Sequence, residues 1–298
     1  MKNIDYIVEM NNDIYDFETL ENQMRALLKK YSFINMNSIG ESVMKKPIYK
    51  ITIGTSTNKV HINASHHANE WITSYIVMKH IEMLCVKIDK KELKLKDINY
   101  DFVPMVNPDG VDLCIHGADN LEDNIRKRVL KINEDSRDFS RWKANINGVD
   151  LNRNYNAGFY DYKSITDIKY PSYSHYPGEV YESEPETRSI VRLTNESNYK
   201  MVLAYHTQGE VIYWDYNGIV VPKAREYAIM FSEVSGYELD KPDELALAAG
   251  YKDWFIKKYN KPGFTIECGS GQNPISVKQS EHILRCTWPI TICLQIQL

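Results

Sequence analysis

Residues 59–76 read KVHINASHHANEWITSYI, and His67-Ala68-Asn69-Glu70 is the part of this stretch that can carry chemistry. The run Lys59–Ala64 alternates apolar and polar residues like a strand, and the apolar run that reaches Val86 indicates a helix. Because His67 and Glu70 stand three residues apart, one helical turn can bring both side chains to a single ion. The stretch therefore predicts a strand-to-helix junction that carries a metal-binding pair.

A third metal ligand is expected at the end of another strand. Catalytic zinc takes three protein ligands and keeps an open position. The run Met201–His206 is an apolar strand that terminates in histidine, and open α/β sheets bind ligands beyond the carboxyl ends of their strands. We therefore predict His206 as the third ligand, with a buried core histidine as the alternative. His66 lies four residues from Glu70 and remains an alternative to His67.

Glu267 is a candidate general base. It follows the apolar run Phe264–Ile266 and precedes Cys268-Gly269. A partly desolvated carboxylate has a raised pKa, which suits it to taking a proton near neutral pH. A solvated acid at a strand end is the alternative interpretation.

Apolar runs of strand type alternate with runs of helical period along the chain. The expected helices cover 16–31, 70–86, 183–195, 222–234, 251–259 and the last part of the chain. The expected strands cover 47–53, 59–64, 100–106, 200–205, 211–214 and 264–267. This order predicts a single α/β domain with a mixed, twisted sheet that is flanked by helices on both faces.

Two local features are also expected. The strands at 47–53 and 59–64 are separated by Gly54-Thr55-Ser56, which predicts a hairpin. Asn107-Pro108-Asp109-Gly110 is a strong turn signal. The stretch 118–178 is polar with weak periodicity, and a long irregular segment in a compact enzyme is often functional.

Composition limits the classes of partner. The net charge of −4 over 298 residues disfavours nucleic acid and anionic membranes, which select basic patches. No stretch approaches the roughly 20 apolar residues that a bilayer span needs, and acidic residues near the N-terminus predict no export signal. Five widely spaced cysteines are typical of free thiols in a reducing compartment. We therefore expect a cytoplasmic protein.

Four motifs together resemble one known family. HANEWIT at 67–73, NPDG at 107–110, GVDLNRN at 148–154 and TIE at 265–267 are similar to segments of the zinc carboxypeptidases, in the same order. The resemblance covers about residues 16–298. It implies a carboxypeptidase-like catalytic domain over 16–298, preceded by an N-terminal extension over 1–15.

Two further segments, 205–214 and 250–255, resemble the branch that contains bacterial γ-D-glutamyl-meso-diaminopimelate peptidases. The resemblance implies one zinc ion on His67, Glu70 and His206, with Glu267 as general base. The implied substrate is the stem peptide of a muropeptide, cut between γ-D-Glu and diaminopimelate. A carboxypeptidase for acidic C-terminal residues and a silent muropeptide-binding protein are the alternatives.

The resemblance also implies a binding site for the terminal carboxylate of the substrate. Asn152 and Arg153 match the pair of residues that holds it in the family. Guanidinium suits this task because it binds carboxylate through two parallel hydrogen bonds. A structural ion pair is the alternative for Arg153.

Two positions depart from the pattern of the family or vary within it. The segment Arg141-Trp142-Lys143 has lysine where family members often carry the oxyanion-stabilising arginine, so either Lys143 or Arg141 is expected to supply that charge. Lys252, 15 residues before Glu267, matches a position in the pocket for the leaving residue. A lysine there favours a leaving residue with a distal negative charge, and a solvent-facing lysine is the alternative.

Overall fold

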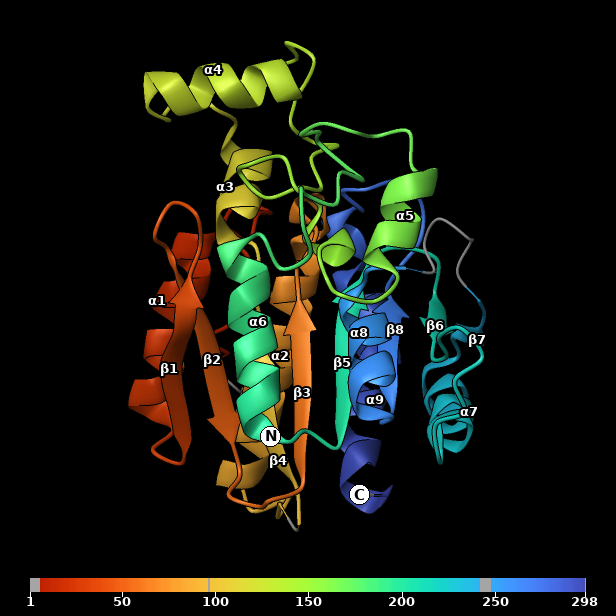
Figure 1. Ribbon diagram of the computed structural model, residues 1–298. Coiled ribbons are helices and arrows are strands. Elements are labelled where there is room, and N and C mark those ends of the chain that lie inside the picture. The colour runs from red at the N-terminus through yellow and green to blue at the C-terminus, as the bar shows by residue number, and fades with distance from the viewer. Residues whose placement is uncertain (1–5, 96, 242–247, 298) are drawn as a thin grey trace.

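The computed structural model describes residues 6–95, 97–241 and 248–297. Its centre is an eight-stranded mixed sheet in the order β1-β2-β4-β3-β5-β8-β6-β7 (Figure 1). The strands are β1 (Ile34–Glu41), β2 (Pro47–Ile53), β3 (Lys59–Ala64), β4 (Asn99–Val103), β5 (Met201–His206), β6 (Val211–Tyr213), β7 (Glu238–Leu239) and β8 (Gly263–Glu267). The central four, β4, β3, β5 and β8, are parallel, so their carboxyl ends meet at one edge.

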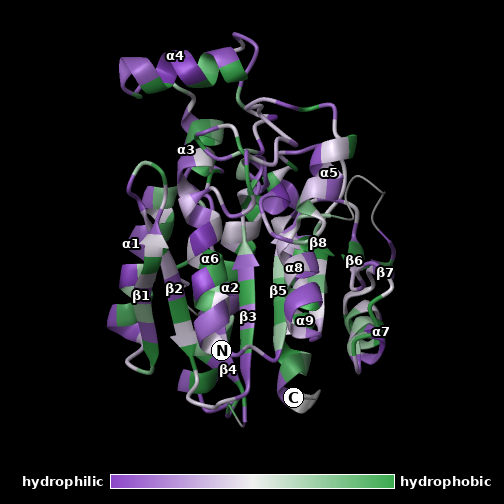
Figure 2. Ribbon diagram, in the orientation of Figure 1, coloured by the Kyte–Doolittle hydropathy of each residue, from purple (hydrophilic) through white to green (hydrophobic). Residues whose placement is uncertain are grey.

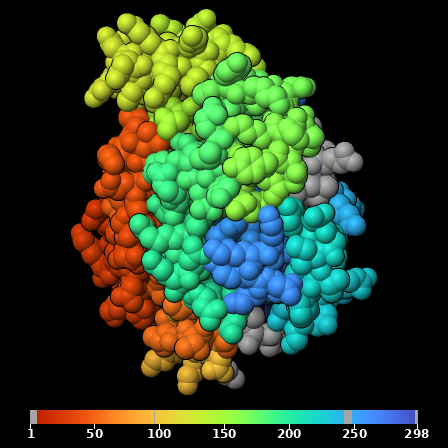
Figure 3. Space-filling view, in the orientation of Figure 1, coloured from red at the N-terminus to blue at the C-terminus, as the bar shows by residue number. Residues whose placement is uncertain are grey.

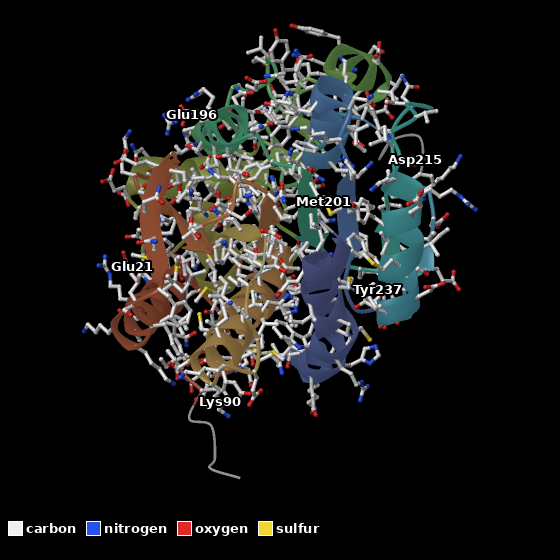
Figure 4. The ribbon with its side chains drawn as sticks, turned by 90° about the horizontal axis from the view of Figure 1, so that it is seen from below. Glu21, Lys90, Glu196, Met201, Asp215 and Tyr237 are labelled. Carbon is white, nitrogen blue, oxygen red and sulfur yellow. The ribbon has the colours of Figure 1, made fainter. Side chains whose placement is uncertain are left out.

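Helices cover both faces of this sheet. They are α1 (Phe17–Lys30), α2 (Ile72–Asp89), α3 (Pro108–His116), α4 (Asp123–Ile132), α5 (Phe159–Ile165), α6 (Pro185–Ser197), α7 (Ala224–Ser235), α8 (Tyr251–Tyr259) and α9 (Ser280–Gln297). Seen along the strands, α6 and α8 lie on one face, with Glu196 marking the end of α6 (Figure 4). The other face carries α1, α2 and α9, and Lys90 marks the end of α2. The predicted α/β class and its two helical layers are confirmed.

The apolar residues lie where this layering requires them. Every residue of β4 and of β5 is buried. One large hydrophobic cluster lies between the sheet and α1, α2 and α9, and a second lies between the sheet and α6 and α8. The loops above the carboxyl ends of the strands are mostly purple and white in Figure 2. No helix among the described residues is long and apolar enough to cross a membrane.

The predicted hairpin at 47–53 and 59–64 is wrong, although both strands exist. β4 lies between β2 and β3, antiparallel to the first and parallel to the second. The connecting loop passes close to the start of β4. A Cβ on Gly54 would lie only 2.6 Å from the carbonyl oxygen of Ile98, the residue before β4. The apolar β4 gains burial on both sides by inserting there, an effect that local sequence does not reveal.

The predicted turn at Asn107-Pro108-Asp109-Gly110 is instead the beginning of α3. The Asn107 side chain caps the helix by accepting a hydrogen bond from the Gly110 N–H at 3.1 Å, and Pro108 occupies the first turn. The Asn107 amide also donates to the carbonyls of His66 and Ala144, at 3.1 and 3.0 Å. This cap therefore joins the His67 loop to the segment that follows Trp142.

The segment 118–178 is less irregular than expected. It contains α4, α5 and the short 3₁₀ helix η2 (Leu151–Arg153). In the space-filling view α4 projects from the top of the molecule (Figure 3). The boundary of the N-terminal extension at residue 15 stays a prediction, and its described part packs on the domain, since the Val8 N–H donates to Glu82 of α2 at 3.0 Å.

The position of β4 inside the sheet yields a stability prediction. Phe102 is 0% exposed, so Phe102→Ala would leave a cavity and lower the free energy of unfolding by about 3–5 kcal/mol. Val220→Ala is the control, because Val220 is 87% exposed and its loss should matter by less than about 0.5 kcal/mol. Urea denaturation measures both, and equal midpoints for the two variants would contradict this placement of β4.

Candidate active site

Three side chains with metal-binding atoms converge where β3 and β5 end. His67 precedes the 3₁₀ turn η1 (Ala68–Glu70), Glu70 closes that turn, and His206 is the last residue of β5. Nδ1 of His67 lies 2.8 Å from Oε1 of Glu70, and Nδ1 of His206 lies 2.9 Å from Oε2. All three residues are buried. Within the described part of the chain, these three residues form a cluster whose ligand atoms all lie within 4.8 Å of one another, close enough to hold one metal ion.

Hydroxyl groups fix the turn that carries Glu70. Ser65 follows β3 with a φ of +51°, and its N–H and hydroxyl bond to Thr73 and Ser74 in the first turn of α2. The Thr73 hydroxyl donates to the Glu70 carbonyl at 2.7 Å. Glu70 thus stands on a short turn before α2, rather than within the long helix that the sequence suggested.

A carboxylate that the sequence analysis had not assigned orients His67. Nε2 of His67 lies 3.1 Å from Oδ1 of Asp150, and Asp150 also accepts the backbone N–H groups of Asn152 and His175. Burial alone would lower the pKa of His67, but the carboxylates of Glu70 and Asp150 raise it to about 9. Asp150 belongs to the GVDLNRN segment, which was its only signal in the sequence.

The donor set of this cluster fits zinc. Two imidazoles and one carboxylate are typical of catalytic zinc, which needs a fourth, open position. Nε2 of His67 faces Asp150, and Nδ1 faces Glu70. Two lone pairs, one on Nδ1 and one on the carboxylate, would repel each other, so this contact needs a proton or a cation between the two atoms. Histidine–carboxylate pairs of this kind orient metal-binding imidazoles in many proteins. The residues present therefore suit a metal ion.

His66, the alternative to His67, points elsewhere. Its Nε2 bonds to the Tyr155 hydroxyl at 2.9 Å, and its ring stacks with those of His206 and Tyr251. Burial and the neighbouring His206 hold its pKa well below the usual value. His66 is therefore not part of the cluster of potential metal ligands.

Glu267 reaches the same place from the next strand. It is the last residue of β8 and is paired with His206 in the parallel register of β5 and β8. Burial and the charge of Glu70 raise the pKa of Glu267 to about 8, against the opposing effects of Lys143 and His67. It lines a cavity of about 260 Å³ whose wall also includes His67 and Glu70 and the residue after His206, Thr207, and we call this space the site cavity.

The site cavity collects most of the predicted residues. Those that line it are His67, Glu70, Lys143, Asn152, Arg153, Lys252 and Glu267. Thr207, Gln208, Tyr213, Asp253, Thr265 and Asn273 also line it and had not been assigned. A larger cavity of about 480 Å³ lies near Phe33 and Leu95, and the described residues in its wall include neither an acid nor a histidine. The site cavity is the one of these two whose wall holds His67, Glu70 and Glu267.

Arg153 presents an unpaired guanidinium to this cavity. Its Nη1 donates to the Asn152 carbonyl at 2.8 Å, while its buried Nε has no partner. No carboxylate among the described residues lies within ion-pair distance, so the alternative of a structural ion pair is not found. Asn152 turns its side-chain oxygen to the Tyr251 N–H at 3.0 Å.

Lys143 lies beside the cluster of potential metal ligands, whereas Arg141 lies on the surface. Nζ of Lys143 lies 3.3 Å from Oε1 of Glu70, and the carboxylates of Glu70 and Asp150 raise its pKa against the effect of burial. Arg141 instead pairs with Glu134 at 2.8 Å on the surface and covers the Tyr173 ring. Of the two candidates for oxyanion stabilisation, only Lys143 lines the site cavity.

Lys252 lies inside the protein, so the alternative of a solvent-facing lysine is wrong. Its side chain is 5% exposed, and its Nζ forms an ion pair with Asp253, the next residue of α8. Asn273 had also been missed. Its amide lies 3.4 Å from Oε1 of Glu70, and its side-chain oxygen accepts the Thr207 hydroxyl at 2.6 Å. Neither of these two contacts of Asn273 has a local sequence signal, because both join segments that are distant in the chain.

Comparison with known proteins agrees with this geometry. Residues 20–286 match the zinc carboxypeptidase family. The chain is 38% identical over 278 residues to gamma-D-glutamyl-L-diamino acid endopeptidase 1 of Lysinibacillus sphaericus, a match that covers 90% of this chain and 69% of that protein. The chain belongs to the zinc carboxypeptidase family and is a peptidase.

Solved structures show the same fold. The carboxypeptidase A of Helicoverpa armigera superposes with a TM-score of 0.76 at 17% identity, over 99% of this chain and 76% of that one. The murein-tripeptide amidase MpaA of Escherichia coli O157 superposes with a TM-score of 0.57 at 19% identity, over 88% of this chain and 92% of that one.

The contact between Asp150 and His67 predicts an effect on metal affinity. Asp150→Asn keeps the shape of the side chain but removes the charge that orients the imidazole, so zinc affinity should fall by about 10–100-fold. Competition with a chelator of known affinity measures this change. Asp161→Asn, at an exposed position of α5, is the control, and an equal affinity for both variants would contradict the role of Asp150.

Proposed function

We propose that the protein hydrolyses the bond between γ-D-Glu and meso-diaminopimelate in short muropeptide stems, with one zinc ion per chain. The observation that carries this proposal is the shared site cavity. It joins the unpaired guanidinium of Arg153 to Glu267 and the cluster around Glu70. A cation at that position favours substrates with a free carboxylate next to the scissile bond. The name of the endopeptidase relative supports the bond type.

Each residue has a proposed part in the reaction. His67, Glu70 and His206 hold the zinc ion, which when bound supplies Lewis-acid polarisation of the scissile carbonyl and of water. Glu267 takes the proton from the attacking water and later delivers it to the leaving amine. Arg153 and Asn152 hold the carboxylate of the leaving residue, which fixes the bond beside Glu267.

Lys143 is the proposed oxyanion partner. A charged ammonium beside the scissile carbonyl stabilises negative charge developing on the carbonyl oxygen. Its position beside Glu70 supports this choice over Arg141, whose guanidinium is paired with Glu134 outside the cavity. The five cysteines are all free thiols, which supports a reducing, cytoplasmic setting as part of the proposal.

Turnover of L-Ala-γ-D-Glu-meso-diaminopimelate tests the proposed function. The metal-loaded protein should release free diaminopimelate, and a chelator should stop the release until zinc is restored. Glu267→Gln removes the general base and should lower kcat by about 10²–10⁴-fold. Glu233→Gln, an exposed glutamate of α7, is the matched control and should retain the activity.

The rival functions give different results in the same assay. Cleavage of an α-linked glutamyl peptide, with none of the γ-linked one, would favour a carboxypeptidase for acidic residues. Binding of the γ-linked peptide without release of any product, in protein that contains zinc, would favour a silent binder. Either result would overturn the proposed function.

A pair of variants tests the oxyanion assignment. Lys143→Met should lower kcat/KM by about 10²-fold, because one donor to a developing oxyanion contributes on that scale. Arg141→Met should stay within about twofold of the unmodified protein. Zinc content is measured for both, since Lys143 also contacts Glu70. A loss on Arg141→Met as large as that on Lys143→Met would contradict the assignment.

A further inference from the structure

The site cavity contains a buried ion pair that the proposed reaction does not use. Lys252 and Asp253 are consecutive residues in the first turn of α8, and both side chains are almost fully buried, at 5% exposure each. Nζ of Lys252 donates to Oδ1 of Asp253 and to the carbonyl oxygen of Asp215 at 2.6 Å. Both residues line the cavity together with Arg153 and Glu267.

Each member of this pair keeps unused hydrogen-bonding capacity. An ammonium group has three N–H donors, and two of those on Lys252 are directed at Asp253 and Asp215. Oδ2 of Asp253 receives no donor from the described residues, whereas Oδ1 receives Lys252. Among the described residues the pair therefore leaves one donor and one carboxylate oxygen without a partner at the wall of the site cavity, and its net charge is zero.

The pair lies next to the group that would hold the substrate carboxylate. A Cβ on Gly250 would lie 3.0 Å from Oδ2 of Asp253 and 3.3 Å from the side-chain oxygen of Asn152. Asn152 precedes Arg153 in η2. A leaving residue whose carboxylate is bound by Arg153 can thus extend its side chain toward Lys252 and Asp253.

We propose that the Lys252–Asp253 pair receives the free distal amino-acid group of the leaving residue, an inference that rests on the proposed function. The distal carboxylate takes the spare donor of Lys252, and the distal ammonium takes Oδ2 of Asp253. This refines the expectation that Lys252 alone selects a negative charge. Asp253 already neutralises Lys252, so a ligand that carries only a carboxylate would meet the charge of Asp253 as repulsion.

A paired receptor of this kind discriminates in two directions. A lysine as leaving residue lacks the distal carboxylate and leaves the Lys252 donor unmatched. A 2-aminopimelate lacks the distal amine and leaves the Asp253 oxygen unmatched. Sites that hydrogen-bond a substrate group reject analogues without that group, because a buried polar atom then loses its partner.

The first test compares substrates on the unmodified, zinc-loaded protein. L-Ala-γ-D-Glu is joined to meso-diaminopimelate, L-lysine or L-2-aminopimelate, and kcat/KM is measured for each. Diaminopimelate should exceed both analogues by at least about tenfold. Equal values for diaminopimelate and either analogue would overturn the paired receptor, and this comparison needs no variant to fold.

Variants then assign each preference to its residue. Asp253→Asn should abolish the preference for diaminopimelate over 2-aminopimelate and keep the preference over lysine. Lys252→Met should do the reverse. Lys257→Met, at an exposed position of the same helix, is the control that should change neither. A structural role for the pair would lower all three substrates by one common factor, and that result would overturn the proposal.

A second series separates this inference from the proposed function. The same three leaving residues are attached to an α-linked L-Glu. Cleavage of the γ series without preference would overturn the receptor and leave the proposed function standing. Cleavage of the α series alone, with diaminopimelate preferred, would overturn the γ-D-Glu assignment and support the receptor. Absence of cleavage in both series would overturn both.

Discussion

The carboxylate of Glu70 is the interaction on which the rest of the site depends. It is 1% exposed, and both of its oxygens face an imidazole nitrogen, one from His67 and one from His206. Lys143 and Asn273 approach Oε1 as well. A buried charge is costly unless it is paired, and a divalent cation among these nitrogens and oxygens would add to the pairing that Lys143 provides. The other residues of the site are arranged around that centre.

The parallel centre of the sheet brings these groups together. His206 and Glu70 are 136 residues apart in the chain, yet β3 and β5 are neighbours and end at the same edge. β8 continues the series and places Glu267 beside His206. Crossover helices place successive parallel strands side by side in one sheet, so the residues at their carboxyl ends lie next to one another although they are distant in the chain. The α3 cap then ties the loops above this row together.

Part of this arrangement could be predicted from local sequence. A strand ending in histidine or glutamate is visible in one stretch of residues, and His206 and Glu267 have that pattern. The order of the sheet is not visible, because β4 enters between β2 and β3 through contacts distant in sequence. The turn predicted at Asn107 is a helix cap for another reason: the same residue types both begin turns and cap helices. Asp150 contacts His67, a partner that only the folded chain supplies because 83 residues separate the two.

The central claim is that the cluster around Glu70 is a zinc centre with nitrogen and oxygen ligands. X-ray absorption spectroscopy at the zinc edge of the purified full chain tests this claim most directly. The account predicts one zinc per chain with two imidazoles and a carboxylate, at nitrogen and oxygen distances of about 2.0–2.2 Å. A sulfur shell near about 2.3 Å, or protein that binds no stoichiometric zinc, would contradict it.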